Sequence, residues 1–265
     1  MARELSDESK IKQNRGKIDL KNPDKYKPWI LARECFKGDG TRHQIPDLFY
    51  RNRTIHLMSD LEKDVYYTLR SNENVVEMFE QFPLMPISKT EGLCEEYGIM
   101  HPKHPITKKN IVMTSDFLLI YKDKNGEKRW IACAVKMSSD LEDIRTREKL
   151  HIEKEYWEAM GVKSYVITEK QINKDYVNNI ILCRQGFTGI GSNSIYDVIK
   201  FLIVNKIINI DMSRPIDLDH LVYKAQKGEI MYGKNIYNEE RFIENRFSIM
   251  VQISDKRNPY HALAV

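Results

Sequence analysis

Two apolar runs joined by a short polar turn constrain the fold of this chain most strongly. The run TSDFLLIYK is followed by DKNGE and then by KRWIACAVK. Asn125-Gly126 between apolar segments is a strong signal for a β-hairpin. Asp116 stands at the head of the first run and Lys136 closes the second, so an antiparallel pair would bring both residues to the same end.

The length of this turn decides whether the two side chains share a face. A strict two-residue turn at Asn125-Gly126 would pair Asp116 with Val135 and point Lys136 to the opposite face. A shared site therefore requires a connection of odd length or a bulge. We predict a three-residue or bulged loop around residues 124–127, which Gly126 could support.

The segments around the hairpin predict an α/β domain. A helix is expected from about Ser59 to Leu69, because Ser59 and Glu62 have the spacing of a capping box. The sequence then suggests a strand at VVEMFEQF, a long polar excursion from Pro83 to Asn110, a helix within EDIRTREKLHIEKEYWEAMG and a buried strand at SYVITE. This order of elements indicates a mixed sheet with helices on its faces.

The character of the chain changes after Ile167. INKDYVNNIILCR, SIYDVIKFLIVN and IDLDHLVYKAQ read as helices, and GEIMYG reads as a small strand. Short helices followed by a strand pair suit a winged-helix type of domain. We therefore predict a catalytic domain over residues 1–167 and a mostly helical, winged-helix-like domain over residues 168–265.

Composition indicates an ordinary globular protein, and only the distribution of charge suggests a partner. The 265 residues carry a formal net charge of +4, which alone would not predict a polyanion partner. The first fifty-odd residues are rich in Lys and Arg, which suits an arm that faces phosphates; the alternative is a solvated leader, loose over about the first 25 residues. The four cysteines show no zinc or disulfide spacing. We see no secretory signal and no membrane-spanning run, so we expect a cytoplasmic protein.

Three ionisable residues are candidates for a catalytic centre. Hydrolysis of a phosphodiester needs hard divalent cations held by carboxylates, and a nearby lysine can orient or deprotonate the water or stabilise the transition state. Glu62, Asp116 and Lys136 fit these roles by type. Each also has a simpler reading: a capping glutamate, a turn-bonding aspartate and a solvated lysine. Glu153 could approach the site as a supporting carboxylate, but a surface salt bridge is the preferred interpretation.

Longer motifs in this order carry a family resemblance. HLMSDLEKDVYYTL, EQFPLMP, MTSDFLLIY, AVK and EKLHIEKEYW resemble TnsA, the endonuclease subunit of heteromeric cut-and-paste transposases. The likeness covers about residues 26–170 closely, including KPWILARE. It implies a catalytic domain similar to type II restriction endonucleases, with Glu62, Asp116 and Lys136 as catalytic residues. The metal ligands would be Glu62, Asp116 and the backbone carbonyl of Val135.

The resemblance also implies cofactors and partners. It implies Mg²⁺ as cofactor, as two ions, with Mn²⁺ able to substitute, and cleavage at the 5′ ends of a transposon. The partners would be double-stranded transposon-end DNA, the transposase subunit TnsB and the ATP-dependent regulator TnsC, the last through the C-terminal domain. The resemblance therefore also implies that the protein acts in the bacterial cytoplasm, on the nucleoid.

One residue departs from the family pattern and leaves alternatives open. Ala134 stands where a Gln or acidic side chain is usual, so an oxygen ligand there must come from the backbone or water. Glu153 matches a family helix glutamate without an assigned role. The alternatives are a catalytically weak scaffold between the transposase and its regulator, and a stand-alone restriction or repair nuclease.

Overall fold

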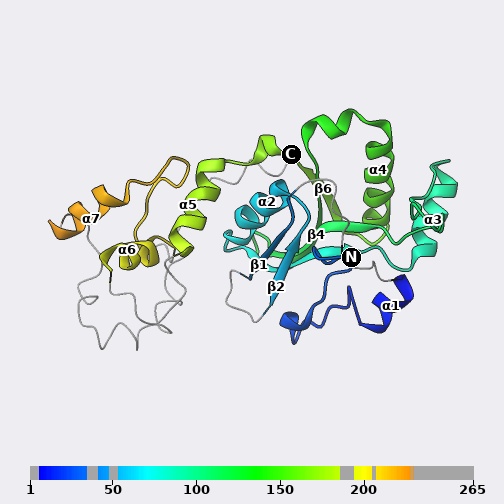
Figure 1. Ribbon diagram of the computed structural model, residues 1–265, viewed down its shortest axis with the longest axis horizontal. Coiled ribbons are helices and arrows are strands. Elements are labelled where there is room, and N and C mark those ends of the chain that lie inside the picture. The colour runs from blue at the N-terminus through cyan, green and yellow to red at the C-terminus, as the bar shows by residue number, and fades with distance from the viewer. Residues whose placement is uncertain are drawn as a thin grey trace. The chain divides into compact units, whose positions relative to one another are not determined.

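The chain forms two compact units, which are described separately. The computed structural model describes residues 6–34, 41–47, 53–185, 194–204, 207–227 and 229. The first unit comprises Met1–Ile172 and the second Asn173–Val265. Figure 1 shows the sheet and its helices in the first unit.

A four-stranded mixed sheet is the centre of the first unit. The strand order is β3-β4-β5-β6, in which the first two joins are antiparallel and β5 pairs with β6 in parallel. Helix α4 connects the two parallel strands, as a parallel join requires. This is the predicted mixed α/β architecture. The strands are Val75–Pro83 (β3), Thr114–Lys122 (β4), Lys128–Val135 (β5) and Lys163–Ile167 (β6).

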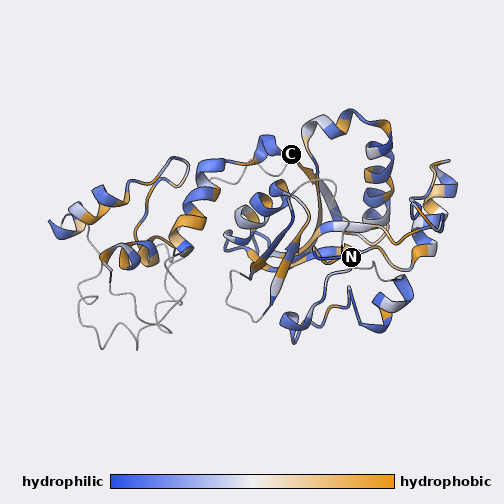
Figure 2. Ribbon diagram, in the orientation of Figure 1, coloured by the Kyte–Doolittle hydropathy of each residue, from blue (hydrophilic) through white to orange (hydrophobic). Residues whose placement is uncertain are grey.

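Two helices cover opposite faces of this sheet (Figure 1). Helix α2 (Asp60–Arg70) buries Leu61, Val65 and Tyr66 in one core with strand residues of odd number in β4 and β5. Helix α4 (Ile144–Glu158) buries Ile152, Tyr156 and Trp157 in a second core with residues of even number. Figure 2 shows the apolar strand segments enclosed between these helices. The alternation along the strands therefore decides which core each side chain enters.

The hairpin confirms the predicted loop of odd length. Phe117 pairs with Cys133 and Lys122 with Lys128, and the Asp123 N–H donates to the Glu127 carbonyl. Three residues, 124–126, therefore form the connection, with Gly126 at φ +79°. If this register is continued by one residue, Asp116 lies opposite Ala134. Lys136 comes two residues after Ala134, so its side chain lies on the same side of β5 as that of Ala134. This is the side on which Asp116 lies.

Several elements were missed by the sequence analysis. The expected polar excursion after Pro83 contains a three-turn helix, α3 (Ile87–Glu96). A separate antiparallel pair, β1 (His43–Pro46) and β2 (Thr54–Leu57), precedes α2. Both strands are short and lack the long alternation on which a strand prediction depends. Short 3-10 turns occur at Pro23–Lys25, Ser138–Glu142 and Glu169–Gln171.

The expectation of a loose N-terminal leader is wrong for residues 6–25. Helix α1 spans Asp7–Lys12 and is capped by Ser6. Lys10 lies over the ring of Trp29, and Arg15 is buried in a bidentate pair with Glu34. Long basic side chains can cover apolar surface and pair internally. Part of the basic arm is therefore engaged internally. Among the residues of the arm that the structure describes, the exposed basic ones are Lys12, Lys17, Lys21, Lys25, Lys27 and Arg33.

The second unit contains the three predicted helices. They are α5 (Lys174–Gln185), α6 (Ile195–Val204) and α7 (Leu218–Gln226). Cys183, Ile199, Leu202 and Val222 are among the residues of their shared core. The strand expected at GEIMYG lies outside the described residues except Glu229, so the winged-helix assignment stays a prediction. None of the helices described in either unit has the length and apolarity to cross a bilayer.

Candidate active site

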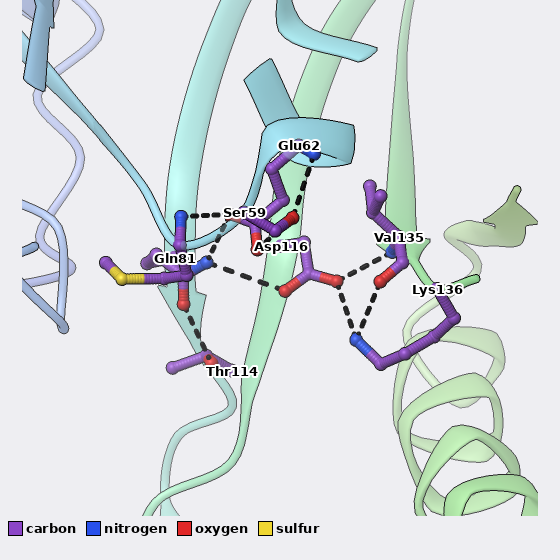
Figure 3. Close-up of polar contacts among 8 residues, drawn as sticks. Ser59, Glu62, Gln81, Thr114, Asp116, Val135 and Lys136 are labelled. Carbon is purple, nitrogen blue, oxygen red and sulfur yellow. Dashed lines mark hydrogen bonds and ion pairs between the residues drawn. The ribbon is translucent and has the colours of Figure 1, made fainter. Parts of the chain in front are cut away.

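Residues from four segments meet at one end of the sheet (Figure 3). Glu62 comes from the first turn of α2, Asp116 from the start of β4, and Val135 and Lys136 from the end of β5. Gln81 of β3 lies between Glu62 and Asp116. The structure thus brings together all the residues that the sequence analysis assigned to catalysis and metal binding, and adds one.

Asp116 and the end of β5 form a tight polar group. Asp116 Oδ2 accepts from the Val135 N–H at 2.6 Å and from Lys136 Nζ at 3.1 Å. Lys136 Nζ also donates to the Val135 carbonyl at 2.8 Å. Burial alone would lower the pKa of Lys136, but the charge and hydrogen bond of Asp116 outweigh it and raise that pKa. Lys136 is therefore an ammonium at neutral pH, held across two oxygen atoms.

Glu62 has two roles in the structure, because it caps a helix and faces the site. Its backbone N–H donates to the N-cap hydroxyl of Ser59 at 3.0 Å, and its carboxylate accepts from the Met58 N–H at 2.9 Å. The simple capping interpretation is thus correct but incomplete. Burial, and next the charge of Asp116, raise the pKa of Glu62 to about 8. Both carboxylates approach the same Gln81 amide, so their charges repel one another, and a shared proton or a bound cation would relieve that repulsion.

Gln81 is the residue of this site that the sequence analysis missed. Its amide Nε2 lies 3.2 Å from Glu62 Oε2 and 3.5 Å from Asp116 Oδ1. Its Oε1 accepts from the hydroxyl of Thr114 at 3.4 Å. Gln81 is buried and has a φ of +47°. The motif EQFPLMP contains Gln81, but nothing in the residue pattern gave it a role in the chemistry.

Glu153 was expected at the surface, and the structure corrects this. It is buried on the sheet-facing side of α4 and lines one hollow with Ala134. Burial, and next the charge of Asp116, raise its pKa to about 8, while the Ser115 hydroxyl and Lys136 act in the opposite direction. Its Oε1 has no hydrogen-bond partner in the structure. The sheet-facing helical period of Ile152 and Tyr156 brackets Glu153 and could have indicated burial.

The donors at this site suit a hard divalent cation. Within the part of the chain that the structure describes, no three His, Cys, Asp or Glu side chains are grouped to hold a metal ion by themselves. The carboxylates of Glu62 and Asp116 and the carbonyl of Val135 supply oxygen alone, which favours Mg²⁺ or Mn²⁺ over zinc. The Lys136 ammonium already bridges two of these oxygen atoms, so they attract positive charge.

The first comparison with known proteins identifies a matching sequence family. Residues 72–169 match the sequence family described as "TnsA-like endonuclease N terminal". This range includes Gln81, Asp116, Lys136 and Glu153, whereas Glu62 precedes it. The mixed sheet flanked by helices is consistent with such an endonuclease domain.

A particular relative extends the match beyond this domain. The chain is 36% identical over 171 residues to Transposon Tn7 transposition protein TnsA of Escherichia coli. The aligned segment covers 64% of this chain and 59% of the length of that relative. The two comparisons together show that this chain carries a segment similar to the TnsA-like endonuclease domain.

Proposed function

We propose that this protein is a metal-dependent DNA endonuclease, the subunit of a cut-and-paste transposase that hydrolyses phosphodiester bonds at the 5′ ends of the transposon. The observation that carries the proposal is the convergence of Asp116 and Lys136 at 3.1 Å, with Glu62 joined to Asp116 through Gln81. The match to a TnsA-like endonuclease domain supports the same reaction class.

Mg²⁺ is the proposed cofactor, bound as two ions, with Mn²⁺ as a substitute. Glu62, Asp116 and the Val135 carbonyl would hold it, because all three present hard oxygen atoms at the same end of the sheet. The bound ion would neutralise the phosphate and lower the pKa of a water molecule. Ala134 offers no side-chain oxygen, so the ligand from β5 would be the backbone carbonyl of Val135.

Lys136 would act as a fixed positive charge beside the reacting phosphate. Its raised pKa keeps the amine protonated at neutral pH in the metal-free protein, which favours a role as a positive charge over a role as a general base. An ammonium that already donates to Asp116 and Val135 can redirect a donor to a phosphate oxygen as negative charge develops there. This assigns transition-state stabilisation, among the roles open to a lysine, to Lys136.

The proposed partners are transposon-end DNA, TnsB and TnsC. TnsB would cut and join the 3′ ends, and TnsC would contact the helical second unit. The exposed basic residues of the N-terminal arm, such as Lys17, Lys21 and Lys25, would approach the DNA backbone. Few basic residues lie in α7, which favours a protein partner over DNA for that helix.

The test is transposition reconstituted with Asp116→Asn. Loss of 5′-end cleavage is expected, with 3′-end joining and complex assembly retained, because the substitution removes charge and leaves the fold in place. Glu127→Gln, at the exposed tip of the hairpin, is the matched control and should cleave normally. Full 5′ cleavage by Asp116→Asn would remove Asp116 from the mechanism. Sequence-specific cutting by the isolated protein would favour a stand-alone nuclease.

A further inference from the structure

Gln81 lies where β3 changes the face to which its side chains point. Met78 enters the core beneath α2 and Phe79 the core beneath α4, as alternation requires. Phe82 should therefore return to the α2 side, yet it packs against Trp157 of α4 with ring centroids 5.7 Å apart. The left-handed φ of +47° at Gln81 accounts for this reversal.

The same backbone conformation directs the Gln81 side chain into the site. Glu80 pairs with Phe117 and Phe82 with Ser115, so the register sets Gln81 opposite Asp116. A left-handed conformation is unfavourable for a residue that carries a side chain. Such local strain is often stored at functional sites. The Gln81 carbonyl accepts from the Trp29 N–H, but this backbone bond requires no particular side chain.

The amide of Gln81 already occupies a position suited to a ligand of a divalent ion. Neighbouring oxygen ligands around Mg²⁺, each about 2.1 Å from the ion, lie about 3.0 Å apart. The amide nitrogen lies 3.2 Å from Glu62 Oε2 and 3.5 Å from Asp116 Oδ1. A half-turn of the amide group places its oxygen at that position and moves the nitrogen to the other side.

Thr114 can accept either orientation of this amide. Its hydroxyl donates to Gln81 Oε1 in the structure. After the half-turn the amide nitrogen would donate to the same hydroxyl oxygen, because a hydroxyl is both donor and acceptor. Without a cation, the amide N–H groups face the two carboxylates; with a cation, the carbonyl oxygen would face it. The exchange leaves no polar atom of the amide unpaired.

We propose that Gln81 is the third side chain of the metal site, and that its amide oxygen binds the divalent ion together with Glu62 and Asp116. The proposal rests on the function proposed above and adds a ligand to it. Mg²⁺ takes six oxygen ligands, and Ala134 contributes none from its side chain. The Gln81 amide on β3 thus supplies the side-chain oxygen that β5 lacks in this chain.

Calorimetry of Mn²⁺ binding to the full chain tests this assignment. Gln81→Met keeps the length of the side chain and removes its oxygen, so Mn²⁺ affinity should fall at least tenfold. Gln81→Glu restores an oxygen and should bind at least as tightly as the wild type. Glu127→Gln, at the exposed end of the hairpin, is the control and should leave affinity unchanged. Unchanged affinity in Gln81→Met would overturn the proposal.

A crystal structure of the wild-type chain with Mn²⁺ gives the answer without any variant. The expected result is anomalous density with Gln81 Oε1 about 2.2 Å from the ion. An ion held by Glu62 and Asp116, with the Gln81 amide outside its coordination sphere, would overturn this inference and leave the proposed function standing. No ion at saturating Mn²⁺ would overturn both.

Discussion

Lys136 Nζ lies 3.1 Å from Asp116 Oδ2, so the first residue after β5 neutralises the aspartate near the start of β4. The same nitrogen also donates a hydrogen bond to the Val135 carbonyl. These are two of the oxygen atoms proposed to bind the metal ion. The ammonium and the ion therefore compete for the same pair of oxygen atoms.

This competition predicts opposite effects on binding and turnover. Lys136→Met should bind Mn²⁺ several-fold more tightly than the wild type, because a competing positive charge is removed. The same variant should lose about two orders of magnitude or more in 5′-end cleavage, because a charge that stabilises the transition state is gone. Calorimetry and single-turnover cleavage measure the two effects. Weaker Mn²⁺ binding in Lys136→Met would show that the ammonium supports the ion instead of competing with it.

Metal binding should release a proton from Glu62. The pKa of Glu62 is raised to about 8 in the metal-free site, and a carboxylate must lose its proton to bind a cation. Titrations at about pH 6.5 in buffers of different ionisation enthalpy should reveal release of about one proton, and less than that above about pH 8. Glu62→Gln should release fewer protons than the wild type at the same pH. A wild-type binding heat that is independent of the buffer would contradict the raised pKa.

Glu153 should make the metal-free fold less stable as pH rises. Its folded pKa of about 8 exceeds the ordinary glutamate value of about 4.5, so the folded state binds a proton more tightly than the unfolded state does. The resulting stabilisation is complete below about pH 4.5 and is lost as pH rises to about 8. Thermal unfolding in EDTA should show this decline.

The matched variants lie on the same helix. Glu153→Gln should flatten the decline in melting temperature between about pH 5 and about pH 8, leaving the part due to Glu62. Glu158→Gln, which is half-exposed on α4, should follow the wild-type curve. A Glu153→Gln curve parallel to the wild type would mean that Glu153 is ionised in the folded protein.

Gly126 should be sensitive to substitution because it closes the three-residue loop at φ +79°. Gly126→Val should lower the free energy of unfolding by about 1–2 kcal/mol or more, since a β-branched residue is strained in this region. Gly126→Asn should cost less, because asparagine tolerates the left-handed conformation. Denaturant unfolding measures both values. Equal stability of the two variants would contradict the loop geometry.

The sequence was sufficient for the parts of the fold that depend on periodicity and turn chemistry. The hairpin and the capped helix at Ser59 follow from patterns confined to a few neighbouring residues. The odd length of the loop followed instead from the requirement that Asp116 and Lys136 share a face. Helix α3 and strands β1 and β2 were missed because they are short and lie within polar surroundings. The N-terminal arm was misjudged, because the partners of Lys10 and Arg15 are Trp29 and Glu34, which are distant in sequence.

Part of the candidate site could also be predicted from the sequence, and part could not. Asp116 and Lys136 could be paired from the register of one hairpin. Gln81 and Glu153 reach the site only through contacts between β3, β4 and α4, which no local spacing encodes. The left-handed conformation of Gln81 is also invisible in the sequence, since glutamine rarely adopts it.

Binding of Mn²⁺ measured by electron paramagnetic resonance tests the central claim most directly. The account predicts that the wild type and the Glu127→Gln control bind Mn²⁺, and that Glu62→Gln and Asp116→Asn each weaken binding at least tenfold. Each removes one carboxylate from a shared ion. Equal Mn²⁺ affinity in all four proteins would show that these two carboxylates do not hold a common metal ion.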